Sequence, residues 1–235
     1  MPELLRSVPS SALAIYAHPD DPDVSCGGTL ARWVSGGSQV HVLVCTNGDK
    51  GTTDPDVSPT ELAKTRALEM TEAAKMLKLA GLHTLGHPDG EIDNDAELRE
   101  QVVRYVRELR PEAVLCPDPT AVLFGEDYLN HRDHRETGFA VLDALSPAAS
   151  LPNYFPTSGP VHQAQVAYLS GTLEPTVWVD ITETIGQKVA AVSCHMTQIP
   201  DPGWADRVVR LRAEAEGQRV GVAFAEAFRR LRLHV

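Results

Sequence analysis

Several residues of this chain carry groups that bind metal ions and transfer protons. His18, Asp20 and Asp21 directly follow an apolar run, residues 13–16, that predicts a buried strand. More than a hundred residues later, His131 and His134 are three positions apart, and this spacing places two side chains on one face of a helix. Hydrolytic zinc is typically held by three nitrogen or oxygen ligands, with the remaining position left to water. These residues can therefore assemble a His/Asp/His metal site, with one carboxylate left over for proton transfer.

The two adjacent aspartates also favour a bound cation. Neighbouring carboxylates repel each other when both are ionised, whereas a divalent cation stabilises both. Bound zinc lowers the pKa of its water to about 7 and polarises a carbonyl. Imidazole and carboxylate ligands do not exclude Fe²⁺. We therefore expect zinc, with Fe²⁺ as the alternative metal.

Three motifs in a fixed order resemble those of a known family. They are residues 18–21 after the first predicted strand, residues 46–51 after the second, and residues 131–134 further along. Weaker matches are Arg66 with Glu69, residues 88–90 and residues 195–198. Together these motifs resemble the zinc-dependent N-acetylglucosaminyl deacetylases, the PIG-L or LmbE-like family, over most of residues 12–200. The resemblance implies a metal-dependent hydrolase that removes the acetyl group from an N-acetylglucosamine-type amino sugar or its conjugate.

The resemblance also implies a role for each residue of the first and last motifs. The implied metal ligands are His18, Asp21 and His134. Asp20 would be the general base that takes a proton from the metal-bound water, and protonated His131 would assist the oxyanion or the leaving amine. Either Asp20 or His131 could return a proton to the amine, and the sequence leaves this choice open.

Other polar residues are expected around this centre. Asp133 is expected to hydrogen-bond an imidazole rather than bind the metal, a common arrangement around metal-binding histidines. The resemblance suggests that Arg66, Asp49 and Asp89 contact the substrate. Both aspartates adjoin a glycine, so an ordinary turn is an equally good interpretation of each.

The chain departs from the family pattern at two places. The first motif usually continues with a glutamate, but here Pro22 follows, and Asp23 could take over an orienting role. Tyr128 lies one position before the place where some relatives have a tyrosine, so it receives no role. The segment 195–198, which contains a histidine and a glutamine, is also left unassigned.

Alternating apolar and helical segments predict an α/β fold, a Rossmann-like, doubly wound, mostly parallel sheet with a C-terminal α/β extension. In such sheets the ligand lies outside the carboxyl ends of the strands, where these motifs fall. The expected strands are residues 12–17, 40–45, 82–85 and 113–116, and the expected helices are residues 27–35, 60–80 and 96–109.

We expect a single domain over residues 1–235, with a core of about 12–145 and an extension of about 146–235. The loop 118–130 is expected at the active site, and the proline-rich segment 146–164 is a candidate for substrate selectivity. The extension is expected to contain strands near 165–170 and 176–180, a helix at 185–195 and a charged helix from about 205 to 233.

The composition of the chain limits the classes of molecule that we expect it to bind. The chain has 21 basic and 32 acidic residues and a formal net charge of −11, which opposes binding to nucleic acid or to an anionic membrane. No segment reaches the roughly 18 apolar residues of a membrane-spanning helix, and residues 1–11 lack the apolar core of a signal peptide. We therefore expect a cytoplasmic protein with a small amino-sugar substrate. The charged C-terminal segment leaves a homo-oligomer open.

Two alternative functions remain open at the level of sequence. An amidase that cleaves a bulkier sugar-thiol conjugate would show the same resemblance, and the volume of the pocket would distinguish it. A zinc-dependent sugar-binding protein without turnover would need the metal ligands but not the base. The presence of Asp20 beside Asp21 speaks against this second alternative.

Overall fold

The computed structural model, which describes residues 3–199 and 201–233, is built around one eight-stranded sheet with the order β1-β9-β10-β8-β5-β2-β3-β4. Neighbouring strands are parallel, except that β10 runs antiparallel to both β8 and β9. The predicted α/β fold with a mostly parallel sheet is thus confirmed. The strands are β1 (Glu3–Leu5), β2 (Ser11–Tyr16), β3 (Gln39–Thr46), β4 (Gly81–His87), β5 (Ala113–Pro117), β8 (Val166–Ser170), β9 (Val177–Asp180) and β10 (Ala225–Arg232).

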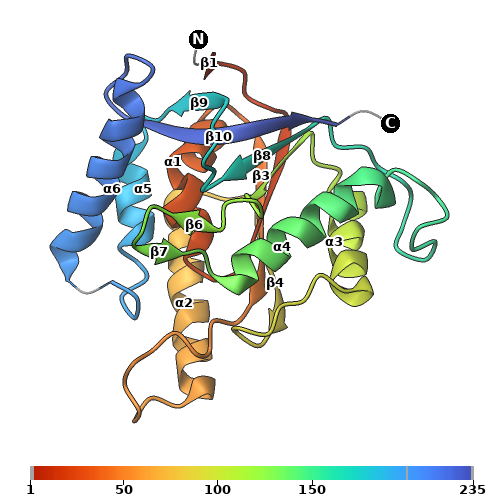
Figure 1. Cartoon of the computed structure of the whole chain (residues 1–235), viewed down its shortest axis with the longest axis horizontal. Coiled ribbons are helices and arrows are strands. Elements are labelled where there is room, and N and C mark those ends of the chain that lie inside the picture. Colours follow the sequence, from red (N-terminus) through yellow and green to blue (C-terminus); the bar gives the residue numbers. More distant parts are fainter. Residues whose placement is uncertain (1–2, 200, 234–235) are drawn as a thin grey trace.

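Helices cover both faces of this sheet (Figure 1). One layer contains α1 (Asp21–Ser35), α2 (Pro59–Leu77), α5 (Ile185–Val192) and α6 (Pro202–Gln218). The other contains α3 (Ala96–Leu109), α4 (Arg132–Asp143) and a short π-helical turn, η1 (Ala144–Ala148). Within the described residues, every helix is too short or too polar to cross a membrane.

The central strands are buried on both faces, which explains their continuous apolar sequences. Side chains alternate along β2: Leu13 and Ile15 pack with the α3–α4 layer, whereas Ala14 and Tyr16 pack with the α1–α2 layer. The two apolar clusters on either side of the sheet therefore share the same strands.

Helix α2 begins and ends near its predicted limits. Ser58 and Glu61 form a reciprocal capping box at its start, which satisfies backbone N–H groups that have no partner inside the helix. The helix ends at Lys78, whose backbone is left-handed with φ of 56°. Gly81 is the first residue of β4. A Cβ there would lie 2.4 Å from Nδ1 of His41, so the packing of β4 on β3 requires glycine.

The C-terminal segment corrects one prediction. The charged helix expected over 205–233 ends at Gln218, the chain turns back, and residues 225–232 form β10 between β8 and β9. Ala225, Glu226 and Phe228 of this strand are buried, while Arg230 pairs with Glu3. Its many arginines concealed a strand pattern, because their long side chains leave the sheet for solvent.

The proline-rich segment 146–164 lies away from the predicted site. The buried guanidinium of Arg107 donates hydrogen bonds to backbone carbonyls of this segment, and His162 contacts the backbone oxygen of Pro111, just before β5 begins. The segment is therefore held near the amino-terminal edge of the sheet. It is not among the residues that line the pocket described below.

Candidate active site

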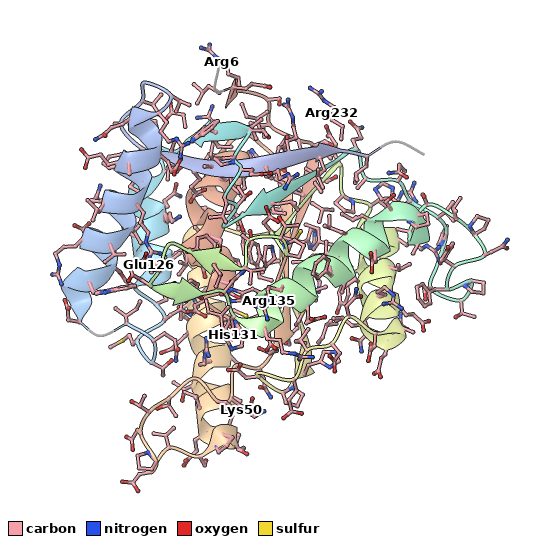
Figure 2. The ribbon with its side chains drawn as sticks, viewed as in Figure 1. Arg6, Lys50, Glu126, His131, Arg135 and Arg232 are labelled. Carbon is pink, nitrogen blue, oxygen red and sulfur yellow. The ribbon has the colours of Figure 1, made fainter. Side chains whose placement is uncertain are left out.

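A pocket of about 360 Å³ opens at the carboxyl edge of the parallel strands, and it contains most of the predicted site residues. In Figure 2, His131 and Lys50 mark this end of the molecule, opposite Arg6 and Arg232. The pocket lies where β2, β3, β4 and β5 end and where α1 and α4 begin. It is lined by His18, Asp20, Asp21, Val24, Gly51, Arg66, Asp89, Tyr128, His131, His134 and Gln198.

Three potential ligand atoms meet in this pocket. Nδ1 of His18 lies 3.2 Å from Oδ2 of Asp21 and 3.1 Å from Nε2 of His134. Nε2 of His134 lies 3.1 Å from Oδ1 of Asp21. A tetrahedral zinc ion with bonds of about 2.0–2.1 Å separates its ligand atoms by about 3.3 Å. The spacing and the chemistry of these donors therefore fit a single divalent metal ion.

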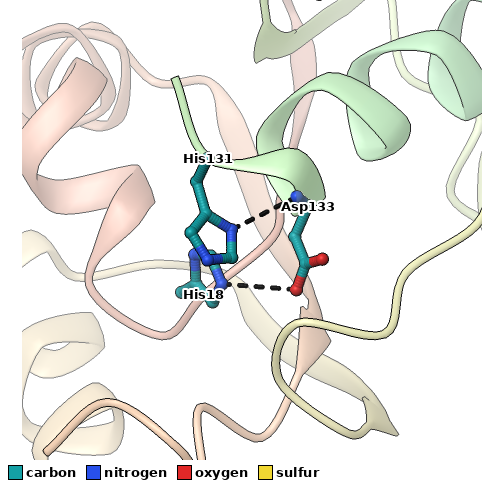
Figure 3. A group of neighbouring side chains, drawn as sticks. All are labelled: His18, His131 and Asp133. Atoms are coloured by element: carbon teal, nitrogen blue, oxygen red, sulfur yellow. Dashed lines mark hydrogen bonds and ion pairs between the residues drawn. The ribbon is translucent and has the colours of Figure 1, made fainter. Parts of the chain in front are cut away.

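The opposite nitrogen of each imidazole is held by a neighbour. Nε2 of His18 lies 3.1 Å from Asp89 and 3.5 Å from Asp133, and Figure 3 shows the second of these contacts. Asp133 is completely buried and accepts the backbone N–H of Gly90 at 2.7 Å. Such contacts fix which ring nitrogen faces a metal. They direct Nδ1 of His18 toward the meeting point of the three ligand atoms.

Asn130 performs the same task for His134, and sequence analysis missed it. Its Oδ1 lies 3.0 Å from Nδ1 of His134, so Nε2 of His134 faces Asp21. The amide nitrogen of Asn130 donates in turn to the carbonyl of Ala121 at 2.8 Å. The only available signal was its position directly before the second histidine motif.

The carboxylates around His18 stabilise positive charge. Burial of the ring opposes protonation, but Asp21, Asp133 and Asp89 together raise the pKa of His18 to about 12. The imidazoles in turn hold the pKa of Asp21 well below its usual value despite its burial. A site with this surplus of carboxylates is suited to a cation.

Asp20 is paired with Arg66. Nη2 of the buried Arg66, on α2, donates to Oδ1 of Asp20 at 2.7 Å, and Nη1 donates to the carbonyl of Gly48 at 3.0 Å. A Cβ on Gly48 would lie 2.5 Å from this guanidinium, so the close approach needs glycine. Arg66 therefore lies in the pocket wall, and its guanidinium pairs with the carboxylate of Asp20. The sequence had suggested only a contact with substrate.

His131 is the N-cap residue of α4, and its ring meets the ring of His18 edge-on, with centroids 4.8 Å apart. Nδ1 of His131 accepts the backbone N–H of Asp133 at 3.2 Å (Figure 3). Desolvation of the ring, aided by nearby His18, lowers the pKa of His131, although the residue as a whole is exposed. Nδ1 is thus the acceptor in this contact, and Nε2 is the ring nitrogen left for another partner.

Asp49 and Asp89 occupy different places. Asp89 lines the pocket and contacts His18. Asp49 does not line it, and its Oδ1 accepts the backbone N–H of Asp89 at 2.9 Å. Lys50 also donates to the backbone carbonyl of Asp89, at 2.6 Å. The loop after β3 thus supports the loop after β4.

The segment 195–198 connects the elements around the site, a role that sequence analysis did not assign. Nε2 of the buried His195 lies 2.8 Å from Asp23, two positions after Asp21 on α1. Thr197 donates its backbone N–H and its hydroxyl to Glu69 of α2, both at 2.7 Å. Asp23 therefore contacts this segment. The weak family match at 195–198 was the signal that could have identified it.

The loop between β5 and α4 reaches the pocket, as predicted for residues 118–130. It contains a small hairpin of β6 (Leu123–Phe124) and β7 (Tyr128–Leu129). Tyr128 lines the pocket, and its side chain is otherwise exposed. Glu126, at the tip of the hairpin, projects toward the α5–α6 side in Figure 2. Tyr128, like Gln198, is thus a pocket residue that the sequence left unassigned.

Comparisons with known proteins agree with this geometry. Residues 13–145 match the family model PIG-L, described as GlcNAc-PI de-N-acetylase. Diacetylchitobiose deacetylase from Thermococcus kodakarensis is 35% identical over 224 residues, which covers 92% of this chain and 81% of the relative. A 1D-myo-inositol 2-acetamido-2-deoxy-alpha-D-glucopyranoside deacetylase from Nocardia farcinica is 27% identical, over 80% of each chain.

A solved structure shows the same similarity in three dimensions. N,N'-diacetylchitobiose deacetylase from Pyrococcus horikoshii superimposes with a TM-score of 0.87 and 32% identity, covering 95% of this chain and 84% of that one. The matched residues 13–145 include both ends of the candidate metal site, from His18 to His134. On sequence and structure alike, the chain belongs to the PIG-L family of de-N-acetylases.

Proposed function

We propose that this chain is a zinc-dependent N-deacetylase that hydrolyses the acetamide of an N-acetylglucosamine-type amino sugar or its conjugate. The observation that carries the proposal is Asp20, held by Arg66 in the same pocket as the three converging ligand atoms of His18, Asp21 and His134. The names of the relatives, which are deacetylases of diacetylchitobiose and of an N-acetylglucosaminyl inositol, support this substrate class.

In this proposal zinc is held by His18, Asp21 and His134, and when bound it activates water and polarises the acetamide carbonyl. Asp133, Asp89 and Asn130 orient the two imidazoles. We extend this orienting role to Asp49, which acts through Asp89, the residue that faces the substrate.

Asp20 moves the proton. Arg66 engages Oδ1 of Asp20, so we assign proton transfer to Oδ2. Asp20 takes a proton from water as the new bond forms between water oxygen and the acetyl carbon. It then gives this proton to the amine nitrogen as the C–N bond breaks, which yields the free amino sugar and acetic acid, and the acid releases its proton to solvent as acetate. His131 donates from Nε2 to the negative oxygen that develops on the acetyl carbon.

We further propose that residues 1–235 act as one domain. β8, from the C-terminal part, pairs with β5 of the core, and β1, at the other end of the chain, pairs with β9. A continuous sheet of this kind supports one folding unit rather than two.

The test is amine release from a substrate panel by zinc-loaded protein, with a chelated sample as control. The panel contains N-acetylglucosamine, N,N'-diacetylchitobiose and an N-acetylglucosaminyl inositol. We expect metal-dependent release from at least one of them. No release from any, by protein shown to hold zinc, would contradict the proposal and favour a bulky-acyl amidase or a sugar-binding protein.

A further inference from the structure

A second cavity, of about 260 Å³, adjoins the pocket described above. It lies between α1, α5 and α6, next to Gly171, just after β8, and the first residues of β10. Because β10 is antiparallel to its neighbours, these residues lie at the same edge of the sheet as the catalytic site. Val24 of α1 lines both spaces, so they meet at this side chain. We call them the catalytic pocket and the side cavity.

The α6 side of the side cavity is largely apolar, with Trp204, Val208, Val209 and Ala213 in its wall. A buried ion pair on its other side is already satisfied: Nζ of Lys188 lies 2.5 Å from Glu226, which also accepts backbone N–H groups of α1. An apolar chain could occupy this space without breaking that pair. Burial of each methylene there would be favourable by the ordinary hydrophobic effect.

Val24 has a distinct place in the catalytic pocket. Among the described residues that line this pocket, it contributes the only aliphatic side chain, and the others are polar, aromatic or glycine. It lies three positions after Asp21, so both side chains share one face of α1. The acetamide of an amino sugar is polar except for its methyl group. When the carbonyl lies at the metal ligands, the methyl finds its aliphatic partner in Val24.

We propose that Val24 limits the acyl group of the substrate to the size of acetyl, and that the side cavity behind it is the space for a longer linear acyl chain. The inference rests on the N-deacetylase function proposed above and adds the residue that sets its acyl specificity. It predicts that a smaller side chain at position 24 joins the two spaces.

The direct test compares wild type with Val24→Ala on N-acetyl-, N-butanoyl- and N-hexanoylglucosamine. One extra methylene in an apolar pocket changes kcat/KM by roughly 10- to 200-fold. We expect the hexanoyl-to-acetyl ratio of kcat/KM to rise at least about tenfold in the variant. Val24→Ile adds one methylene at this position and should lower the butanoyl-to-acetyl ratio of kcat/KM. Alanine favours helix more than valine does, so α1 should persist in Val24→Ala.

Two further variants test whether the change in chain-length preference arises where the two spaces meet. Val34→Ala makes the same change near the other end of α1, where the side chain lines neither space, and should keep the wild-type ratio. Ala213→Phe added to Val24→Ala fills the side cavity and should remove the gain with hexanoyl substrate.

Binding gives a readout that needs no turnover. Trp204 lines the side cavity, so its fluorescence should change when a chain enters. Titrating metal-free Val24→Ala protein with N-hexanoylglucosamine should give a saturable change, and this change should disappear when Trp204→Phe is added.

The outcomes separate this inference from the proposed function. If Val24→Ala hydrolyses the acetyl substrate with the wild-type chain-length ratio, the inference is wrong and the deacetylase stands. A gain that survives the filling variant would also overturn it. If zinc-loaded wild type releases no amine from any substrate, acetyl included, both fail.

Discussion

Asp20 and Asp21 are adjacent in sequence, yet their surroundings separate their chemistry. Asp21 faces two imidazoles, which suits a metal ligand. Asp20 faces the guanidinium of Arg66, which engages one of its oxygens, and the proposed mechanism assigns proton exchange to the other. Both residues are aspartates, so the difference between them comes from their partners, which are imidazoles for Asp21 and a guanidinium for Asp20.

Replacing Asp20 by asparagine tests whether this residue accepts the proton without binding the metal. Because asparagine cannot accept the proton, we expect kcat to fall by about 10²–10⁴-fold. Zinc content should stay at the wild-type value, since the ligand atoms come from other residues. Kinetic and metal analyses are run in parallel with Asp56→Asn, an exposed position in the loop before α2, as control. Wild-type kcat in the Asp20 variant would refute its role as base.

At the scale of elements, α1 carries both Asp20 and Asp21 at its start and is bent at Cys26, where the backbone leaves helical geometry with φ of −144°. The carboxylate of Glu226, on β10, accepts the N–H groups of Gly28 and Thr29 just after this bend, at 3.0 and 2.7 Å. A strand near the C-terminus thereby holds the helix that presents the candidate metal site.

We expect Glu226→Ala to lower the free energy of unfolding by about 3–5 kcal/mol, because it leaves Lys188 buried without its partner. Denaturant titration measures the change. Glu174→Ala removes an exposed carboxylate that pairs with Arg229 of the same strand, and should cost at most about 1 kcal/mol. Equal losses of unfolding free energy in the two variants would show that the buried Glu226–Lys188 pair contributes no more than an exposed ion pair.

Gly28 gives a second test of how α1 packs. A Cβ there would lie 2.7–2.9 Å from atoms of Ile181, so Gly28→Ala should destabilise the protein by about 1–3 kcal/mol. Gly186→Ala, on α5, has open space within 4 Å of the new Cβ and should stabilise by about 0.5–1 kcal/mol. Thermal melts of both variants distinguish the sites. A neutral Gly28→Ala would mean that α1 can move away from Ile181.

At the scale of the whole molecule, the candidate metal site joins parts that are distant in sequence. His18 follows β2, whereas His134 belongs to α4, and only the sheet brings them together. A metal bound by both should stabilise the folded state. At a free zinc concentration 100-fold above the dissociation constant, this linkage contributes about 2.7 kcal/mol.

Zinc should therefore raise the melting temperature of chelated protein by roughly 5–10 °C for a chain of this size. Calorimetry with His134→Ala should show this shift abolished, whereas His41→Ala, outside the pocket, should retain it. A shift that persists without His134 would place the metal elsewhere.

Much of this organisation could be predicted from sequence, because short-range patterns encode it. The buried strands β2, β3 and β5 read as apolar runs, and the motifs stand directly after them. β10 could not be predicted, since its arginines hide a strand whose burial depends on partners far away in sequence. The contacts of Asn130, and of Arg66 with Asp20, likewise depend on tertiary packing and leave no local pattern.

We propose that this pocket hydrolyses an acetamide with the help of a bound metal. The most direct measurement is the parallel quantification of acetate and free amine from N,N'-diacetylchitobiose incubated with protein holding one equivalent of zinc. We predict equimolar acetate and amine, lost on chelation and restored by zinc. Absence of both products from zinc-loaded, folded protein, or equal release from chelated protein, would contradict the account.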